Sequence, residues 1–209
     1  MQDISWKDNL RIAWFGCFLT GASISLVVPF MPIFVEQLGV KGDQVAFYSG
    51  LAISVSAISA AFVSPIWGIL ADKYGRKPMM IRAGLAMTIT MGGLAFVPNV
   101  FWLLFLRFLN GVFTGFVPNA TALIASQVPK DRSGYALGTL STGVVAGTLT
   151  GPFVGGFIAE IFGIRNVFLL VGSFLFLAAI LTILFIKENF QPVPKEKALP
   201  TKELFTSVK

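Results

Sequence analysis

A short charged turn separates two long apolar runs of the sequence. It contains Asp72, Arg76 and Lys77, together with Gly68 and Gly75. The preceding apolar run predicts a helix, so Asp72 falls at a helix C-terminus, where the dipole disfavours a carboxylate unless a cation faces it. Arg76 and Lys77 are near enough to supply that cation. Gly68 would allow close helix approach and Gly75 a tight turn. A plain basic loop would explain the cations but not the aspartate or the glycines.

The fourth apolar run carries polar and small residues that could line a cavity. Its candidates are Arg107, Asn110, Gly111, Gly115 and Asn119. Those at 107, 111, 115 and 119 recur every four residues and would share one helix face. An arginine inside a span is costly and rarely faces lipid. Arg107 is also about two turns from the outer end of its run, so its side chain could instead extend to the interface.

The fifth apolar run contains a regular stripe of glycines. The residues concerned are Gly143, Gly147, Gly151 and Gly155, with Pro152 and Gly156 beside them. A spacing of four places the first four on one helix face, where another helix can approach to backbone contact. Pro152 removes a hydrogen bond and predicts a bend. Tight packing alone would explain the stripe, and a role in transport is the other interpretation.

The elements that must position these residues are transmembrane helices. Of 209 residues, 55% are hydrophobic and only 12% are charged, which suits hydrocarbon better than water. Six apolar runs are long enough to cross a bilayer as helices. They are Leu10–Leu38, Gln44–Ala71, Met79–Val97, Val100–Val128, Ser133–Phe162 and Val167–Ile186. We therefore predict an all-α membrane protein with a cytoplasmic N-terminus at 1–9, a six-helix bundle at 10–186 and a cytoplasmic linker or tail at 187–209.

The positions of the charges predict orientation rather than nucleic-acid binding. Apart from Arg107, thirteen Lys and Arg residues lie at one set of span ends and two, Lys41 and Arg165, at the other. This bias predicts a multi-pass plasma-membrane protein with both termini in the cytoplasm. The sequence has one cysteine and no histidine, which excludes a disulfide framework, a Cys/His zinc site and a His-dependent triad. We expect no metal site and no enzymatic activity.

The sequence also repeats itself once. Residues 71–77 are echoed by residues 159–165, with acid matching acid, aromatic matching aromatic and glycine matching glycine. Three spans separate the two copies, so the second copy would face the opposite side of the bilayer. Inverted three-helix repeats are typical of secondary transporters.

Residues 68–77 resemble the signature of the loop between the second and third helices of the major facilitator superfamily. The resemblance implies a twelve-helix fold, of which this chain would form one half. It also implies that Asp72 and Arg76 form a charge relay in a cytoplasmic gate, whose partner includes a helix of the second half. Residues 107–111 resemble a pattern of proton-coupled members, which implies that Arg107 tunes a nearby carboxylate. Glu36, at the outer edge, is the only acid within the first apolar run, Leu10–Leu38.

Two further segments resemble the drug:proton antiporter branch of this superfamily. Residues 147–156 are similar to its fifth-helix motif, and residues 26–32, with Pro29 and Pro32, to the first-helix motif of twelve-span drug exporters. The resemblance implies proton-driven export of amphiphilic drugs such as fluoroquinolones and dyes. The expected partners are the lipid bilayer, these drugs, protons and a second six-helix half. We expect no cofactor, because the proton gradient would supply the energy.

Two alternatives remain open at this point. The chain could belong to another solute transporter of the same fold, for sugars or metabolites, because the loop signature does not separate these classes. It could also be a truncated half that does not transport. The sequence does not identify the substrate, the proton-binding carboxylate or the oligomeric state.

Overall fold

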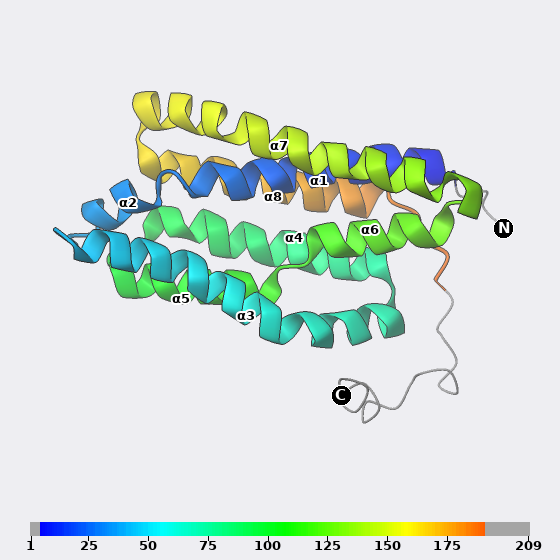
Figure 1. The fold of residues 1–209 in the computed structure, drawn as a ribbon, viewed down its shortest axis with the longest axis horizontal. Helices are drawn as coiled ribbons and strands as arrows, with labels where there is room; N and C mark the ends of the chain where they lie inside the picture. The colour runs from blue at the N-terminus through cyan, green and yellow to red at the C-terminus, as the bar shows by residue number, and fades with distance from the viewer. Residues whose placement is uncertain (1–4, 191–209) are drawn as a thin grey trace.

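The computed structural model describes residues 5–190. These residues form mostly apolar helices that pack side by side in a bundle (Figure 1). The helices are α1 (Trp6–Val27), α2 (Met31–Gln37), α3 (Gln44–Tyr74), α4 (Arg76–Gly93), α5 (Val100–Phe113), α6 (Phe116–Gln127), α7 (Ser133–Phe162) and α8 (Ile164–Phe185), with short 3₁₀ turns η1 (Leu94–Phe96) and η2 (Lys130–Arg132). Within the described residues, six helical segments are long and apolar enough to span a membrane, as the sequence predicts.

The segments run alternately up and down the bundle (Figure 1). The most extensive contacts join α1 to α7 and α8, α4 to α8, and α3 to α5. Buried apolar side chains form one cluster near α2, where the rings of Phe34 and Phe168 lie 4.5 Å apart. A second cluster, around Cys17 and Phe116, fills the other end. Many large apolar side chains remain exposed on the outside, as expected where the solvent is lipid.

Two of the predicted spans are interrupted. The first breaks between α1 and α2, and the fourth between α5 and α6, where Gly115 has φ +133°. The expectation that residues 107, 111, 115 and 119 share one helix face is therefore wrong, because the first two lie in α5 and Asn119 lies in α6. Pro32 and Pro118 fall in the first turns of α2 and α6, where a missing N–H costs no hydrogen bond.

The two echoed segments form matching turns. Gly75 (φ +103°, ψ +160°) joins α3 to α4, and Gly163 (φ +84°, ψ +161°) joins α7 to α8. Each glycine donates its N–H to the carbonyl four residues earlier, at 2.9 Å from Gly75 and 3.1 Å from Gly163. The turns lie at opposite ends of the bundle (Figure 1), as an inverted repeat requires. Because each glycine starts the next helix, α4 and α8 both begin three residues earlier than predicted.

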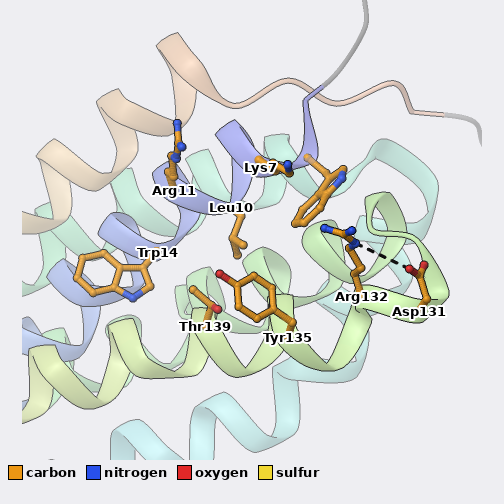
Figure 2. Close-up of a pocket in the computed structure, with 9 residues that line it drawn as sticks. Lys7, Leu10, Arg11, Trp14, Asp131, Arg132, Tyr135 and Thr139 are labelled. Atoms are coloured by element: carbon orange, nitrogen blue, oxygen red, sulfur yellow. Dashed lines mark ion pairs between the residues drawn. The ribbon is translucent and has the colours of Figure 1, made fainter.

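A hollow of about 750 Å³ lies beside the starts of α1 and α7 (Figure 2). Its wall includes Leu10, Trp14 and Tyr135, and its rim carries charged side chains. Arg132 lies 3.8 Å from Asp131. None of the residues that the sequence analysis selected lines this hollow, so the candidate site lies elsewhere.

Candidate functional site

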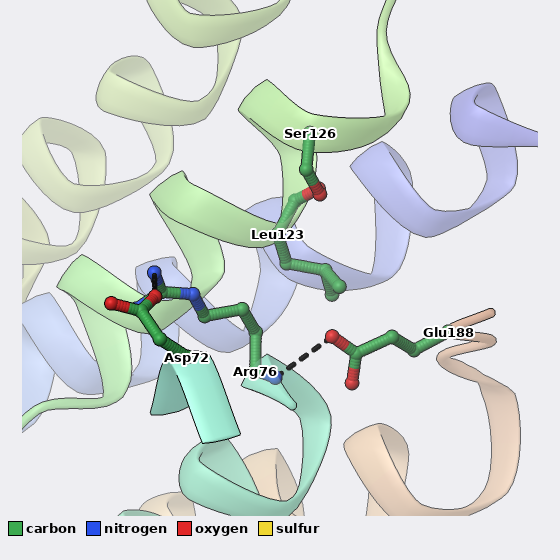
Figure 3. A network of polar contacts seen from close by, with 5 residues as sticks. All are labelled: Asp72, Arg76, Leu123, Ser126 and Glu188. Atoms are coloured by element: carbon green, nitrogen blue, oxygen red, sulfur yellow. Dashed lines mark hydrogen bonds and ion pairs between the residues drawn. The ribbon is translucent and has the colours of Figure 1, made fainter. Parts of the chain in front are cut away.

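The α3–α4 turn brings the predicted charge pair together. The Arg76 guanidinium at the start of α4 contacts the Asp72 carboxylate near the end of α3, across the turn at Gly75 (Figure 3). The Asp72 side chain is 60% exposed, so this pair contributes about 1 kcal/mol at most to folding stability. The pair is therefore a minor contributor to the stability of the fold.

Glu188 adds a second carboxylate to this turn, which the sequence analysis did not select. Its two oxygens accept hydrogen bonds of 2.8 Å from the backbone N–H groups of Arg76 and Lys77. Figure 3 shows the bond from Arg76. These donors belong to the first turn of α4, where helical N–H groups have no partner within the helix and the dipole favours an anion. Glu188 therefore acts as an N-terminal cap supplied by a residue that follows α8.

Lys77 has a different partner from the expected one. Its ammonium group donates to the carbonyl of Ile183 at 3.0 Å, near the C-terminus of α8. A cation is favourable there because the carbonyls of the last helical turn are unpaired. Arg76 alone contacts Asp72 among the described ion pairs, so the expectation that both cations face this carboxylate is only half right.

The chain after α8 is also tied to α1 and α6. Asn9 donates to the Lys187 carbonyl at 2.6 Å and to the Gln127 side chain at 2.7 Å. The Lys187 N–H donates back to Asn9 at 3.0 Å. Residues 187 and 188 are thus anchored to the bundle, and residues 191–209 of the predicted tail lie outside the described residues.

A hollow of about 500 Å³, called the central hollow here, lies where α1, α3 and the α5–α6 break meet. Gly68 and Arg76 of the charged turn line it, together with Gly111 and Asn119. No described atom lies within 4 Å of the position that a Cβ at Gly68 would occupy. Gly68 therefore opens onto the hollow, and the expectation that it permits close helix packing is wrong within this part of the chain.

The α5–α6 break shapes one wall of the central hollow. Asn119 donates to the carbonyl of Gly115 at 2.7 Å and so stabilises the first turn of α6. Gly111 faces α3, where a Cβ would collide with the carbonyl of Ser56. The residues of this wall are mostly small or apolar, a lining suited to apolar and amphiphilic ligands.

Arg107 and Asn110 lie inside the helix packing rather than on the wall of the hollow. Arg107 is only 7% exposed and donates from Nε to the carbonyl of Ala52 at 3.1 Å. It does not extend to the interface. Asn110 accepts from Thr90 at 3.2 Å and donates to Ser56 at 3.4 Å. Both residues join α5 to neighbouring helices, and no acidic side chain is among the described partners of Arg107.

The glycine stripe forms a closed seam between α7 and α1. A Cβ at Gly147 would collide with the backbone of Phe18, and one at Gly151 would lie 2.8 Å from the carbonyl of Ala22. At Gly155 a Cβ would meet the side chain of Leu26. The prediction of backbone contact is correct, and the partner is a helix of the same bundle.

Two predicted residues of this segment lie off the seam. A Cβ at Gly156 would have no described atom within 4 Å, and Pro152 lies within the continuous helix α7. Pro29 falls in the α1–α2 break, and Pro32 lies in the first turn of α2. Glu36 is exposed on α2, away from the residues that line the central hollow.

Comparisons with known proteins agree with this architecture. The sequence profile of the Major Facilitator Superfamily matches residues 13–208. The chain is 88% identical, over its whole length, to 52% of the multi-drug resistance efflux pump PmrA of Streptococcus pneumoniae. It is 58% identical over 99% of its length to 51% of the PmrA homolog of Lactococcus lactis. The chain thus spans about half the length of these curated relatives.

A solved structure supports the fold independently. The crystal structure of the human organic anion transporter MFSD10 matches 96% of this chain with a TM-score of 0.79 at 16% identity, over 53% of its own length. At that level of identity the likeness concerns the fold alone.

Proposed function

Because the chain belongs to the major facilitator superfamily, we propose that it forms the N-terminal half of a proton-coupled exporter of amphiphilic drugs. The observation that carries this proposal is the central hollow, which residues of the charged turn and of the broken fourth span line together. A ligand in the hollow would thus lie next to the proposed gate. The relatives named multidrug efflux pumps support export as the direction of transport.

The composition of the hollow favours substrates that are apolar and variable in shape. Alanine, glycine and apolar side chains form most of its wall, and Arg76 is the one charged residue among the described residues that line it. Apolar packing tolerates differences in ligand shape better than a set of directed hydrogen bonds does. Dyes and fluoroquinolones fit this class. A second six-helix half would close the other side of the hollow.

Asp72 and Arg76 would act as a latch between the two halves, with Gly68, Gly75 and Lys77 shaping the same turn. We place this turn and both termini in the cytoplasm, because the excess of Lys and Arg lies at that end of the spans. The energy source would be the proton gradient, without a bound cofactor. Arg107 and Asn110 would support the proton-coupled step from within the packing of α5, and a carboxylate of the second half would carry the proton.

A transport assay tests this function directly. Cells carrying the protein from its full reading frame should extrude ethidium, inverted vesicles carrying it should accumulate ethidium, and a protonophore should abolish both. Gly151→Ala should slow extrusion several-fold, because the added Cβ pushes α1 away from α7. Gly156→Ala is the matched control, since its Cβ enters open space. Transport of sugars in place of dyes, or dye extrusion that is indifferent to the protonophore, would contradict the proposal.

A further inference from the structure

The break between α5 and α6 leaves backbone carbonyls without their helical partners. The carbonyls of Val112 and Thr114 stand at the end of α5, where the chain turns at Gly115 into α6. The carbonyls in the last turn of a helix accept no hydrogen bond from an N–H group of the same helix. Inside a membrane no water is present to bind an unsatisfied backbone group, so a break in the middle of a span requires donors from elsewhere.

Two side chains from neighbouring helices supply these donors. Trp67 of α3 donates its indole N–H to the carbonyl of Val112 at 2.6 Å. Arg82 of α4 donates from Nη2 to the carbonyl of Thr114 at 3.3 Å. The break is therefore held on both sides of Phe113 by groups that lie far away in the sequence.

Trp67 and Arg82 also stack on each other. The guanidinium carbon of Arg82 lies 3.4 Å from the centre of the Trp67 ring, a stacked cation–π contact that gains strength where water is excluded. Arg82 Nε and Nη1 are buried with no hydrogen-bond partner among the described residues. None of the ion pairs within residues 5–190 includes Arg82. Its charge is thus stabilised by an aromatic face and a carbonyl dipole rather than by a carboxylate.

We propose that Arg82 and Trp67 are positioning residues that fix the α5–α6 break and thereby shape the wall of the central hollow. Trp67 itself lines the hollow, as do Thr114, Gly115 and Val117 on the far side of the hydrogen bonds. The role of the hollow in substrate binding rests on the proposed function. The mechanical role of the pair does not, and it can be tested without any transport.

The first test measures the shape of the break in the absence of substrate. Val117→Cys, in a background in which Cys17 and any other cysteine of the full reading frame are serine, reports on access to the wall through its rate of reaction with a maleimide. Arg82→Met removes the donors and the charge, and Trp67→Phe keeps an aromatic face but removes the N–H. Each should change the reaction rate at least about threefold. Arg82→Lys should restore most of the parent rate, because an ammonium group can still donate to a carbonyl.

Arg165 provides a matched control. It also donates to two carbonyls near a helix end, those of Ala95 at 2.7 Å and Val97 at 3.3 Å, but at a site away from the central hollow. Arg165→Gln should leave the rate at Val117→Cys unchanged. An equal change in the control, or parent rates in both Arg82→Met and Trp67→Phe, overturns the proposal. If Arg82→Met is missing from the membrane, the reaction rate of Trp67→Phe alone decides, because that variant retains Arg82 and an aromatic ring beside it.

The second test uses transport kinetics. If the hollow binds substrate, Trp67→Phe should raise the KM for ethidium by about threefold or more and leave the maximal rate within about twofold of the parent. A fall in maximal rate at unchanged KM contradicts a role in shaping the wall. If the parent protein moves no dye at all, the proposed function fails, while the labelling result still decides whether Arg82 and Trp67 fix the break.

Discussion

The turn at Gly75 and the turn at Gly163 have nearly the same backbone and different chemistry. Their glycines share positive φ, ψ near 160° and the same hydrogen bond to the carbonyl four residues back. At the first turn Asp72 contacts Arg76, and Glu188 caps α4. At the second, Glu160 is exposed and takes part in none of the ion pairs of the described residues.

The repeated sequence accounts for the backbone of both turns, and the proposed gate depends on side chains that only the first turn has. The repeated sequence reproduces the turn at both ends of the bundle, so the backbone alone does not make a latch. The second carboxylate at the first turn comes from Glu188, which lies after α8 and outside the echoed segments. The cation of the second turn, Arg165, donates instead to carbonyls at the end of η1. Side chains added to a common turn therefore distinguish the proposed gate from a structural connection.

The largest effect should come from adding a Cβ at the two glycines. Both conformations are ones that residues with a side chain rarely adopt, so Gly163→Ala should cost about 2 kcal/mol of stability from strain alone. Gly75→Ala should cost about 1 kcal/mol more, because its Cβ would also lie 2.9 Å from the Glu188 carboxylate. Thermal unfolding of the detergent-purified variants measures the difference. Equal losses would show that Glu188 contributes nothing to the first turn.

A smaller effect is expected for Arg165→Gln. Two charge-assisted hydrogen bonds to Ala95 and Val97 are lost, and because Arg165 is exposed the expected cost is about 1.5 kcal/mol. The melting temperature should fall while dye extrusion by the folded protein stays near the parent rate. A selective loss of extrusion without loss of stability would assign gate chemistry to the second turn and remove the contrast.

The smallest effect should follow Glu188→Gln. An amide retains one acceptor for the backbone N–H groups of α4 but loses the charge that the helix dipole favours, so the expected cost is about 0.5 kcal/mol. Glu160→Gln is the matched control and should leave the melting temperature unchanged. Added salt should narrow the gap between Glu188→Gln and the parent, because screening weakens partly exposed charges.

Much of the architecture follows from sequence pattern alone. Long apolar runs predict the six spans, and the echo around Gly75 and Gly163 predicts two matching turns. The four-residue spacing of Gly147, Gly151 and Gly155 predicts backbone contact, although it does not name α1 as the partner. These features are predictable because each depends on local composition or on a regular spacing.

The remaining features depend on single contacts between distant segments. The break at Gly115 depends on the positive φ of a single residue. The mean hydropathy of the surrounding residues does not reveal it. Glu188 binds backbone N–H groups, so a search of the sequence for oppositely charged side chains does not predict its role. In the sequence Arg82 is one of many basic residues near a span end, and its stacking on Trp67 depends on how α3 and α4 pack. In each case the partner is set by tertiary packing.

The most direct measurement compares ethidium extrusion by Asp72→Asn and Glu160→Gln, with each variant present in the membrane at the parent level. If the first turn alone forms a latch, Asp72→Asn should slow extrusion about fivefold, equivalent to about 1 kcal/mol between the open and closed states, while Glu160→Gln stays at the parent rate. Equal rates in the two variants would contradict the assignment of gate chemistry to one end of the bundle.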